Sequence, residues 1–296
     1  MNNYDVIVIG GGHAGCEAAH ASARSGAKTL LVTMKTASIG QLSCNPAVGG
    51  IGKSHLAREV DALDGLIAKV SGNSALQMRK LNLRKGPAVQ ATRIQTCRVT
   101  YKKYMQLELE NCPGLEVAEG QVTSLIIRNS EIVGVKLSDY SEIYARAFIL
   151  TAGTFLGGKI HIGQKSFSAG RVGDESSSEL EAFFSNNGFM LGRLKTGTPP
   201  RILRKSIDFS ALDSQDSDDD APRLSFLYDH YEMKPNYLKN IPCYITHTNP
   251  NTHQIINDSK DLSPMYTGVI KSKGPRYCPS IEDKIVRFSE KSSHQI

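Results

Sequence analysis

A glycine-rich turn near the N-terminus constrains the fold of this chain more than any other feature. Gly10, Gly12 and Gly15 form the pattern G-x-G-x-x-G. The β-branched run YDVIVI at 4–9 precedes the turn, an Ala-rich segment at 16–25 follows it, and a further apolar run occupies 28–33. This strand–turn–helix context predicts a βαβ unit with parallel strands, in which a pyrophosphate lies at the helix N-terminus.

The second strand lacks a residue that dinucleotide sites usually have. An acid commonly follows that strand and binds the ribose hydroxyls, but the stretch LVTMK at 31–35 contains none. The turn alone therefore does not choose between FAD and NAD. The segment AFILTAGTFLGG at 147–158 favours a flavoprotein with two dinucleotide sites, because small residues after a strand allow close backbone approach.

The remaining pattern predicts an α/β chain with a Rossmann-type FAD domain and a β-rich inserted domain. We expect helices at 54–66, 99–110 and 180–190, polar loops at 38–53 and 82–93, and a β-meander at about 115–150 that begins with 115–119. The acidic run 213–220 is expected to be a solvated loop. The expected domains are 1–201 for FAD, 202–272 as the β-rich insertion and candidate NAD-binding domain, and 273–296 as a return to the FAD domain.

Composition excludes several classes of protein. Apolar residues make up 40% of the 296 residues, which is too many for a disordered chain, and no apolar run is long enough to span a membrane. The six cysteines form no CxxC pair, and the start of the chain shows no secretory leader, so we expect reduced thiols in a cytoplasmic protein. The net charge of +6 is weak evidence for a polyanionic partner. His247 and His253 lack the spacing and companions of a metal site, and no metal is expected.

Several long motifs carry a specific resemblance. They are GGGHAGCEAA at 10–19, SCNPAVGGIGK at 43–53, LNLRKGPAVQATR at 81–93, RLKTGTPPR at 193–201 and GPRYCPSIEDKIVRF at 274–288. Together and in this order, the chain from residue 4 to 296 resembles the GidA/MnmG family of FAD-dependent enzymes that modify the wobble uridine of certain tRNAs. The family likewise has a small polar residue where Thr33 stands.

The resemblance implies a reaction and its partners. Members act with the GTPase MnmE, in an expected heterotetramer around a homodimer, and add an aminomethyl-type group such as carboxymethylaminomethyl to carbon 5 of the uridine. Methylenetetrahydrofolate supplies the one-carbon unit, glycine or ammonium the nitrogen, and FAD mediates electron transfer with NADH as reductant. Members also continue beyond the equivalent of Ile296, so we expect this chain to be the N-terminal portion of such an enzyme, with weak FAD binding and poor activity alone.

The resemblance also assigns site residues. Cys44 and Cys278 match two cysteines proposed to act on the uracil ring. The residues matching FAD contacts are Gly10, Gly11, Gly12, His13, Ala14, Gly15, Val122 and Ser177. Those matching the segment assigned to NAD are Gly274, Pro275, Arg276, Tyr277, Cys278, Pro279, Ser280, Ile281, Glu282, Asp283, Lys284, Ile285, Val286, Arg287 and Phe288.

Residue chemistry supports the two cysteines in part. A thiolate that adds to carbon 6 of uracil raises the electron density at carbon 5, and it needs a positive, partly exposed site. Cys44 lies in a polar loop and Cys278 follows Arg276 and Tyr277, which fits. For Cys16, Cys97, Cys112 and Cys243 we expect small buried hydrophobes.

Other polar residues leave alternatives open. Lys85, Gly86, Pro87 and Arg93, with Lys195, Arg201, Arg276 and Lys284, form either a rim for phosphate or tRNA or an ordinary basic surface. Glu282 and Asp283 are either an acid/base pair or surface residues. At the level of function, a folate- and FAD-dependent tRNA uracil methyltransferase of the TrmFO type and a non-catalytic flavin-binding partner subunit remain as alternatives.

Overall fold

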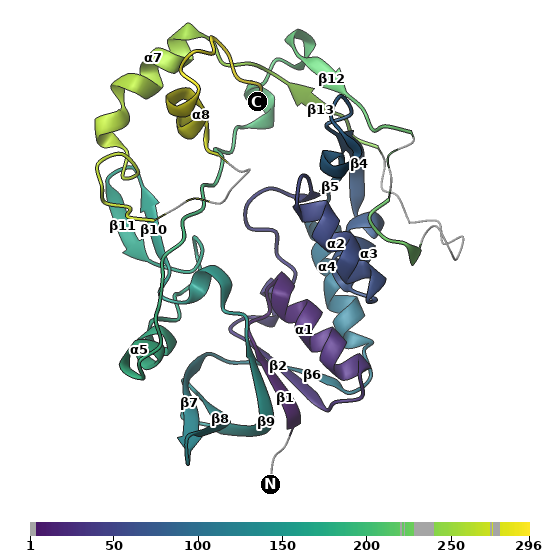
Figure 1. Cartoon of the computed structure of the whole chain (residues 1–296), viewed down its shortest axis with the longest axis vertical. Coiled ribbons are helices and arrows are strands. Elements are labelled where there is room, and N and C mark those ends of the chain that lie inside the picture. The colour runs from purple at the N-terminus through teal and green to yellow at the C-terminus, as the bar shows by residue number, and fades with distance from the viewer. Residues whose placement is uncertain (1–3, 220, 222, 228–239, 273, 275–278) are drawn as a thin grey trace.

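The computed structural model describes residues 4–219, 221, 223–227, 240–272, 274 and 279–296. A six-stranded sheet, in the order β6-β2-β1-β9-β8-β7, lies at the end of the structure that holds the N-terminus (Figure 1). Its strands are β1 (Tyr4–Ile9), β2 (Thr29–Thr33), β6 (Leu115–Glu119), β7 (Val122–Arg128), β8 (Glu131–Leu137) and β9 (Glu142–Leu150). The expected βαβ start of a Rossmann-type fold is confirmed, because β1 and β2 pair in parallel on either side of a helix.

Strand β9 joins two kinds of pairing in one sheet. Its first residues, 142–144, pair antiparallel with β8, and its last residues, 145–150, pair parallel with β1. The antiparallel set β7–β8–β9 is thereby continuous with the parallel set β6–β2–β1. This arrangement brings the turn after Leu150 directly beside the glycine-rich turn after Ile9.

Helices and the antiparallel strands cover opposite faces of the parallel strands. The helices are α1 (His13–Arg24), α2 (Lys53–Ala62), α3 (Leu66–Asn73), α4 (Arg98–Glu110), α5 (Ser178–Asn186), α7 (Pro250–Asp258) and α8 (Ile281–Arg287). Helices α1, α3 and α4 pack one core with Val8 and Leu31, while Ile7, Ile9 and Leu30 face a second core with β7, β8 and α5 (Figure 1). The alternation explains why β1 and β2 are apolar at nearly every position.

Strand β6 is not part of the meander, which contains only β7, β8 and β9. It pairs in parallel with β2 along residues 115–119. Helix α4 precedes β6 and makes the crossover that a parallel pairing requires. The expectation of four antiparallel strands was wrong at this point, because strand pattern alone does not reveal direction.

A small second sheet includes parts of the two segments expected to be loops, since β3 lies within 38–53 and β5 begins within 82–93. It has the order β3-β5-β4, with β3 (Ala47–Gly49), β4 (Ala75–Leu81) and β5 (Ala91–Thr96), all antiparallel. The helix expected at 54–66 corresponds to α2, which ends at Ala62; a break that includes Asp64, with a φ of 63°, separates it from α3. Two further hairpin-like pairs are β10 (Lys159–Ile162) with β11 (Lys165–Ser168), and β12 (Asp213–Gln215) with β13 (Cys243–Ile245).

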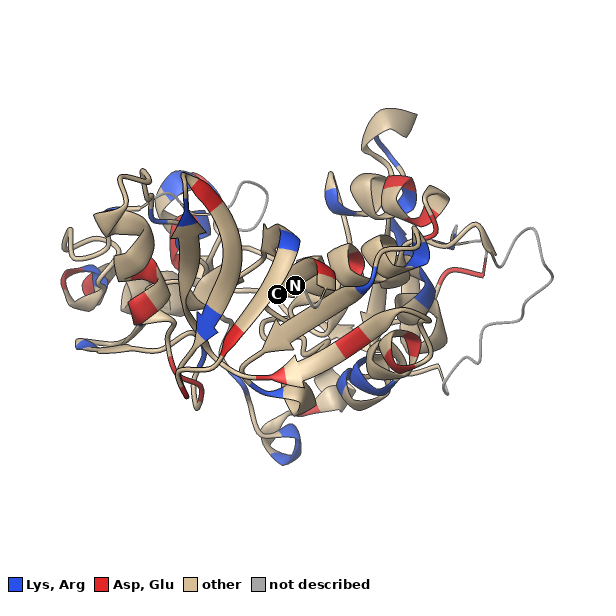
Figure 2. Ribbon diagram, turned by 90° about the horizontal axis from the view of Figure 1, so that it is seen from below, with Lys and Arg blue, Asp and Glu red and all other residues tan. Residues whose placement is uncertain are grey.

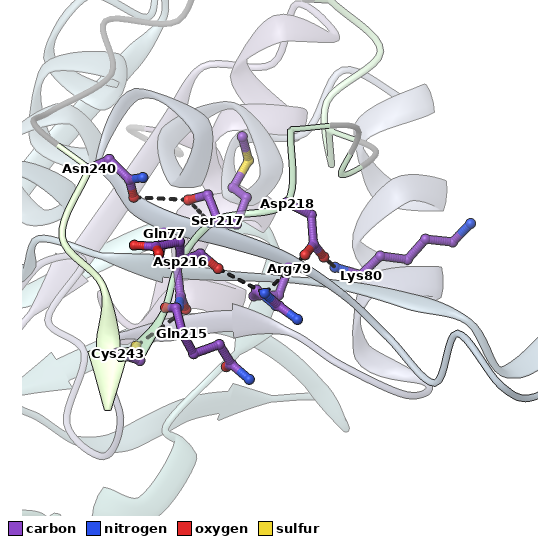
Figure 3. A network of polar contacts seen from close by, with 10 residues as sticks. Gln77, Arg79, Lys80, Gln215, Asp216, Ser217, Asp218, Asn240 and Cys243 are labelled. Atoms are coloured by element: carbon purple, nitrogen blue, oxygen red, sulfur yellow. Dashed lines mark hydrogen bonds and ion pairs between the residues drawn. The ribbon is translucent and has the colours of Figure 1, made fainter. Parts of the chain in front are cut away.

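Part of the acidic run binds strand β4, although Asp213, Ser214, Asp216 and Asp219 remain exposed (Figure 3). Asp218 accepts a hydrogen bond from the Lys80 backbone at 2.8 Å and forms an ion pair with Arg79 at 3.0 Å. The Met78 backbone donates to the Ser217 hydroxyl at 3.1 Å. The run therefore binds the backbone groups of an edge strand that would otherwise be unpaired.

The segment 202–272 contains less strand than expected. Its described residues form the three-residue strands β12 and β13, the helix α7 and short 3₁₀ turns. Leu224 is buried in the core on the α1, α3 and α4 side. The proposed division into three domains stays a prediction. Among the described residues, no helix is both long and apolar enough to cross a membrane.

Charged residues of both signs are mixed over the surface seen from below (Figure 2). The net charge of +6 therefore does not translate into a single basic face in that view. Local groups, not the total charge, decide where an anion binds.

A carboxylate from α1 caps α3. Both carboxylate oxygens of Glu17 accept hydrogen bonds from the Leu66 backbone, at 3.0 and 2.9 Å, and one accepts from Ile67 at 2.7 Å. These N–H groups have no partner within their own helix, and a negative charge is favourable at this end.

We predict that Glu17→Ala lowers the free energy of unfolding by about 1–2 kcal/mol, as loss of an N-terminal cap does. Urea unfolding followed by circular dichroism measures the change. Glu59→Ala on exposed α2 is the matched control, since it makes the same substitution in a helix without removing a cap. Equal stability of the two variants would show that the contact with α3 does not matter.

Candidate functional site

The glycine-rich turn joins the end of β1 to the start of α1 and lies against the turn after β9. The Thr151 hydroxyl donates to the carbonyl oxygens of Ile9 and Gly10, both at 2.9 Å. A Cβ on Gly15 would lie 1.8 Å from the Gly10 oxygen. Only glycine at position 15 therefore allows α1 to pack this closely on the strand, as the sequence pattern predicts.

The N-terminus of α1 is open to a ligand. Gly12 is the N-cap residue, with no side-chain hydrogen bond to the helix and no atom within 4 Å of where a Cβ would lie. Unpaired N–H groups and the positive end of the helix dipole bind anions at such a position. The geometry fits a pyrophosphate at Gly12, with Gly11 packed against Thr33 behind it.

A carboxylate from a neighbouring strand contacts the segment that follows β2. Glu119, at the end of β6, accepts hydrogen bonds from the Thr36 backbone at 2.8 Å and from its hydroxyl at 2.9 Å. Both bonds hold the pKa of Glu119 below its usual value. Ser177 reaches the same end of β2, with its hydroxyl 3.8 Å from the Met34 sulfur. In Rossmann-type folds the ribose of the nucleotide binds near the end of the second strand, so the role of Ser177 as a cofactor contact stays a prediction.

Val122 and His13 differ in what they offer a ligand. The Val122 side chain is buried in the second core, so only its backbone can contact a bound molecule. His13 lies beside Tyr101, with ring centroids 5.6 Å apart, and neither His13 Nε2 nor the Tyr101 hydroxyl has a hydrogen-bond partner among the described residues. Burial lowers the pKa of His13, so the imidazole is neutral at neutral pH.

Cys44 lies in a loop that other motifs hold in place. Its thiol donates to the Gly197 carbonyl oxygen at 3.3 Å, and its own carbonyl oxygen accepts from Arg98 and Arg201. Arg171 donates to the adjacent Ser43 hydroxyl at 3.1 Å and pairs with Asp174. The Cys44 residue is thus half-buried, with two guanidinium groups on its backbone carbonyl oxygen, and positive groups near a partly exposed cysteine suit a reactive thiol.

The motif that contains the second predicted cysteine approaches the same loop. Pro275, Arg276, Tyr277 and Cys278 lie outside the described residues. Ser280 begins α8, and its Cβ lies 4.0 Å from where a Cβ on Gly197 would be. Lys195 pairs with Asp283 at 3.5 Å. The loop 195–198 therefore contacts Cys44 on one side and the start of α8 on the other.

The charged residues of α8 have structural partners. Asp283 forms a capping box with Ser280 and is also 3.6 Å from Arg287. Lys284 donates to the Gln295 carbonyl oxygen at 3.4 Å. Asp283 is therefore held by cations and backbone groups, an arrangement that differs from an acid/base pair with Glu282. The described residues contain no cluster of His, Cys, Asp and Glu that could hold a metal, and His253 instead stacks on His294.

Cys97 differs from the buried thiol expected from the sequence. It is the N-cap residue of α4 and is half-buried. Hydrogen bonds from the Thr100 hydroxyl and from the backbone N–H groups of Thr100 and Val99 lower the pKa of its thiol. By contrast, Cys16 is buried and desolvation raises its pKa to about 12. The signal for Cys97 was its position directly before a predicted helix.

The fold and the turn define a Rossmann-type α/β protein with an anion site for a dinucleotide at the start of α1. The model of the family described as Glucose inhibited division protein A matches residues 5–296, and the chain belongs to that family. The chain is similar to GidA of Aquifex aeolicus in two crystal forms. The first has 44% identity and a TM-score of 0.90, covering 100% of this chain and 49% of that one; the second has 41% and 0.87, covering 100% and 47%. The chain therefore spans about half the length of these solved relatives.

We predict that iodoacetamide at about pH 7 alkylates Cys97 faster than Cys112 and Cys243, and leaves Cys16 unmodified in the native protein. The sign follows from the thiolate fraction: a lowered pKa gives Cys97 a larger thiolate fraction at the same pH, whereas burial raises the pKa of the other three thiols. Peptide mass spectrometry over time gives each rate. Thr100→Val should slow Cys97 alone, and Thr123→Val, which removes a distant hydroxyl, should not. A Cys97 rate equal to that of Cys243 would contradict the assignment.

Proposed function

We propose that the protein of which this chain forms part is an FAD-dependent tRNA-modifying enzyme, which adds an aminomethyl or carboxymethylaminomethyl group to carbon 5 of the wobble uridine. Family membership supports a flavin-dependent tRNA-modifying activity. Because the chain spans 47–49% of the length of its solved relatives, the activity is proposed for the whole protein.

One observation carries this proposal. Cys44 and the start of α8, which are more than two hundred residues apart in the sequence, both contact the loop 195–198. The Cys44 motif and the described start of α8 thereby meet at one place in the fold, while Cys278 itself lies outside the described residues. A reaction with two cysteines requires such a convergence, which supports the proposal.

The glycine turn provides the cofactor site. The groups proposed to hold FAD are the backbone of Gly10–Gly15, the open N-terminus of α1, the Val122 backbone and the Ser177 hydroxyl near Met34. FAD supplies electron transfer when bound, with NADH proposed as the reductant along residues 274–288. Methylenetetrahydrofolate is the proposed one-carbon donor.

The chain's own residues suggest how the uracil is activated. The Cys44 thiolate adds to carbon 6, which places negative charge on carbon 5 and O4 and makes carbon 5 attack the one-carbon electrophile. Loss of the proton from carbon 5 then expels the thiolate and restores the double bond between carbons 5 and 6. The neighbouring guanidinium groups of Arg98 and Arg201 stabilise the anionic thiolate and the developing enolate. Cys278 is proposed as the second cysteine of the reaction.

The proposed partners are tRNA and the GTPase MnmE. Family resemblance is the support for the GTPase, for a homodimer, and for the heterotetramer that the two proteins would form. A cytoplasmic location is proposed on the same ground.

We predict that Gly12→Ala in the full-length protein abolishes most FAD binding without unfolding it. The added methyl group enters open space in front of α1, which costs the fold little but occupies the place of the pyrophosphate. Flavin absorbance per protein after purification measures the loss. Gly192→Ala is the matched control, because position 192 also has open space around a Cβ. Equal flavin content in both variants would rule out this site.

Nucleoside analysis of tRNA tests the reaction. A strain that lacks the gene is complemented with the full-length gene, and the expected product is an aminomethyl-type wobble uridine. Cys44→Ser should retain flavin and lose this product by at least about a hundredfold, as expected when a nucleophile is removed. Cys243→Ser should keep it, because that thiol only bonds the buried Gln77 side chain.

Each alternative gives a different result. A methylated uridine in the T-loop would indicate a folate-dependent methyltransferase instead. A protein that binds the GTPase but is colourless and does not alter tRNA would indicate a non-catalytic partner subunit. Full activity of Cys44→Ser with bound FAD would overturn the role of that thiol.

A further inference from the structure

Two arginines converge on one backbone oxygen beside the Cys44 thiol. Arg98 is the first residue of α4, and Arg201 ends the motif at 193–201. Each donates to the Cys44 carbonyl oxygen. A guanidinium group has five N–H donors, so both keep most of their donors for another acceptor.

The positive charge at this place is not neutralised within the described part of the chain. Neither arginine forms an ion pair there with a carboxylate. The two positive charges repel each other. Burial, together with the positive charge of Arg201, lowers the pKa of Arg98. The N-terminus of α4 adds the positive end of a helix dipole. Like charges that are held together by one carbonyl oxygen favour binding of an anion between them.

We propose that Arg98 and Arg201 bind a backbone phosphate of the RNA substrate next to the nucleotide that reacts at Cys44. This inference rests on the tRNA-modifying function proposed above. Paired guanidinium groups bind phosphate oxygens through two parallel hydrogen bonds each, which ammonium groups do not.

The geometry of a nucleotide explains why the site is beside the thiol. An enzyme that acts on a base takes it out of the stack, and the backbone of that nucleotide must follow. A uracil at the Cys44 thiol therefore brings its own flanking phosphates close to the same loop. A dinucleotide does not need these arginines, because its pyrophosphate would bind at the N-terminus of α1.

Hydrogen bonds and ion pairs within the chain hold the loop that contains Cys44 in place. The Gly197 oxygen accepts from the Cys44 thiol, and Arg171 fixes Ser43 while pairing with Asp174. Asp174 also pairs with Lys35 after β2, at 2.9 Å. Because Arg98 and Arg201 contact the Cys44 backbone, a phosphate bound to them also fixes the position of the nucleophile.

The test uses the full-length protein with FAD and an unmodified tRNA transcript. Arg98→Gln and Arg201→Gln are each compared with wild type, and Arg128→Gln, on the distant strand β7, is the matched control for loss of one exposed arginine. The dissociation constant is measured from about 50 to 300 mM salt, together with flavin content and melting temperature. We expect each site variant to weaken binding several-fold and to lower the slope of log K against log salt by about one, with flavin content unchanged.

Several results would overturn the proposal. An unchanged salt slope would mean that the arginines only support the loop. Loss of flavin with unchanged tRNA binding would mean that their anion is a dinucleotide phosphate. If the Gln variants do not fold, Arg98→Lys and Arg201→Lys carry the test: weaker binding with a nearly unchanged slope supports the site, since the charge stays while the paired hydrogen bonds are lost, and wild-type affinity overturns it. Failure of the wild-type protein to bind tRNA at any salt concentration would instead reject the proposed function itself.

Discussion

The structure depends on one close backbone approach, between the glycine-rich turn and Thr151. The Thr151 hydroxyl bonds two consecutive carbonyl oxygens of the turn, and a side chain at Gly15 would collide with one of them. This contact fixes β9 beside β1 and α1 against both. From α1, Glu17 caps α3, so the approach at the turn also determines where the helical layer lies. The cofactor site and the fold therefore share the same residues.

Local patterns predicted much of the fold, and long-range pairing explains what they missed. The βαβ start, helix α4 and strands β7–β9 each have a periodicity that a short window contains. Strand β6 has such a pattern too, but its parallel partner β2 lies 86 residues earlier, since Thr29 pairs with Leu115. The acidic run at 213–218 looks solvated by composition, yet Asp218 and Ser217 bind the backbone of β4 (Figure 3). An unpaired strand edge is a property of the folded sheet, and composition does not reveal it.

The residues of the candidate site also divide into those that the sequence marked and those that only the folded structure connects to the site. Gly12, Ser177 and Cys44 were found because a motif or a family resemblance marked them, and their placement in the fold is compatible with the roles proposed for them. Arg98 has no motif, and only its contact with the Cys44 carbonyl oxygen connects it to the site. Cys97 was missed because the argument for a buried thiol ignored its position as the N-cap residue of α4, where neighbouring donors of the first turn lower the pKa of the thiol. Both Cys97 and Arg98 lie at the start of α4, a helix that the sequence pattern predicted correctly.

The distribution of charge connects these observations. The formal charge of +6 is spread among acids on the surface (Figure 2), and several basic residues are already paired, as Arg171 and Lys35 are with Asp174. A polyanion therefore gains little from the total charge and much from groups that remain unpaired. Two such places stand out: the open start of α1, which suits a pyrophosphate, and the Arg98–Arg201 pair beside Cys44. Because the first would bind through backbone N–H groups and the second through guanidinium groups, the proposed dinucleotide and RNA backbone would not compete for the same donors.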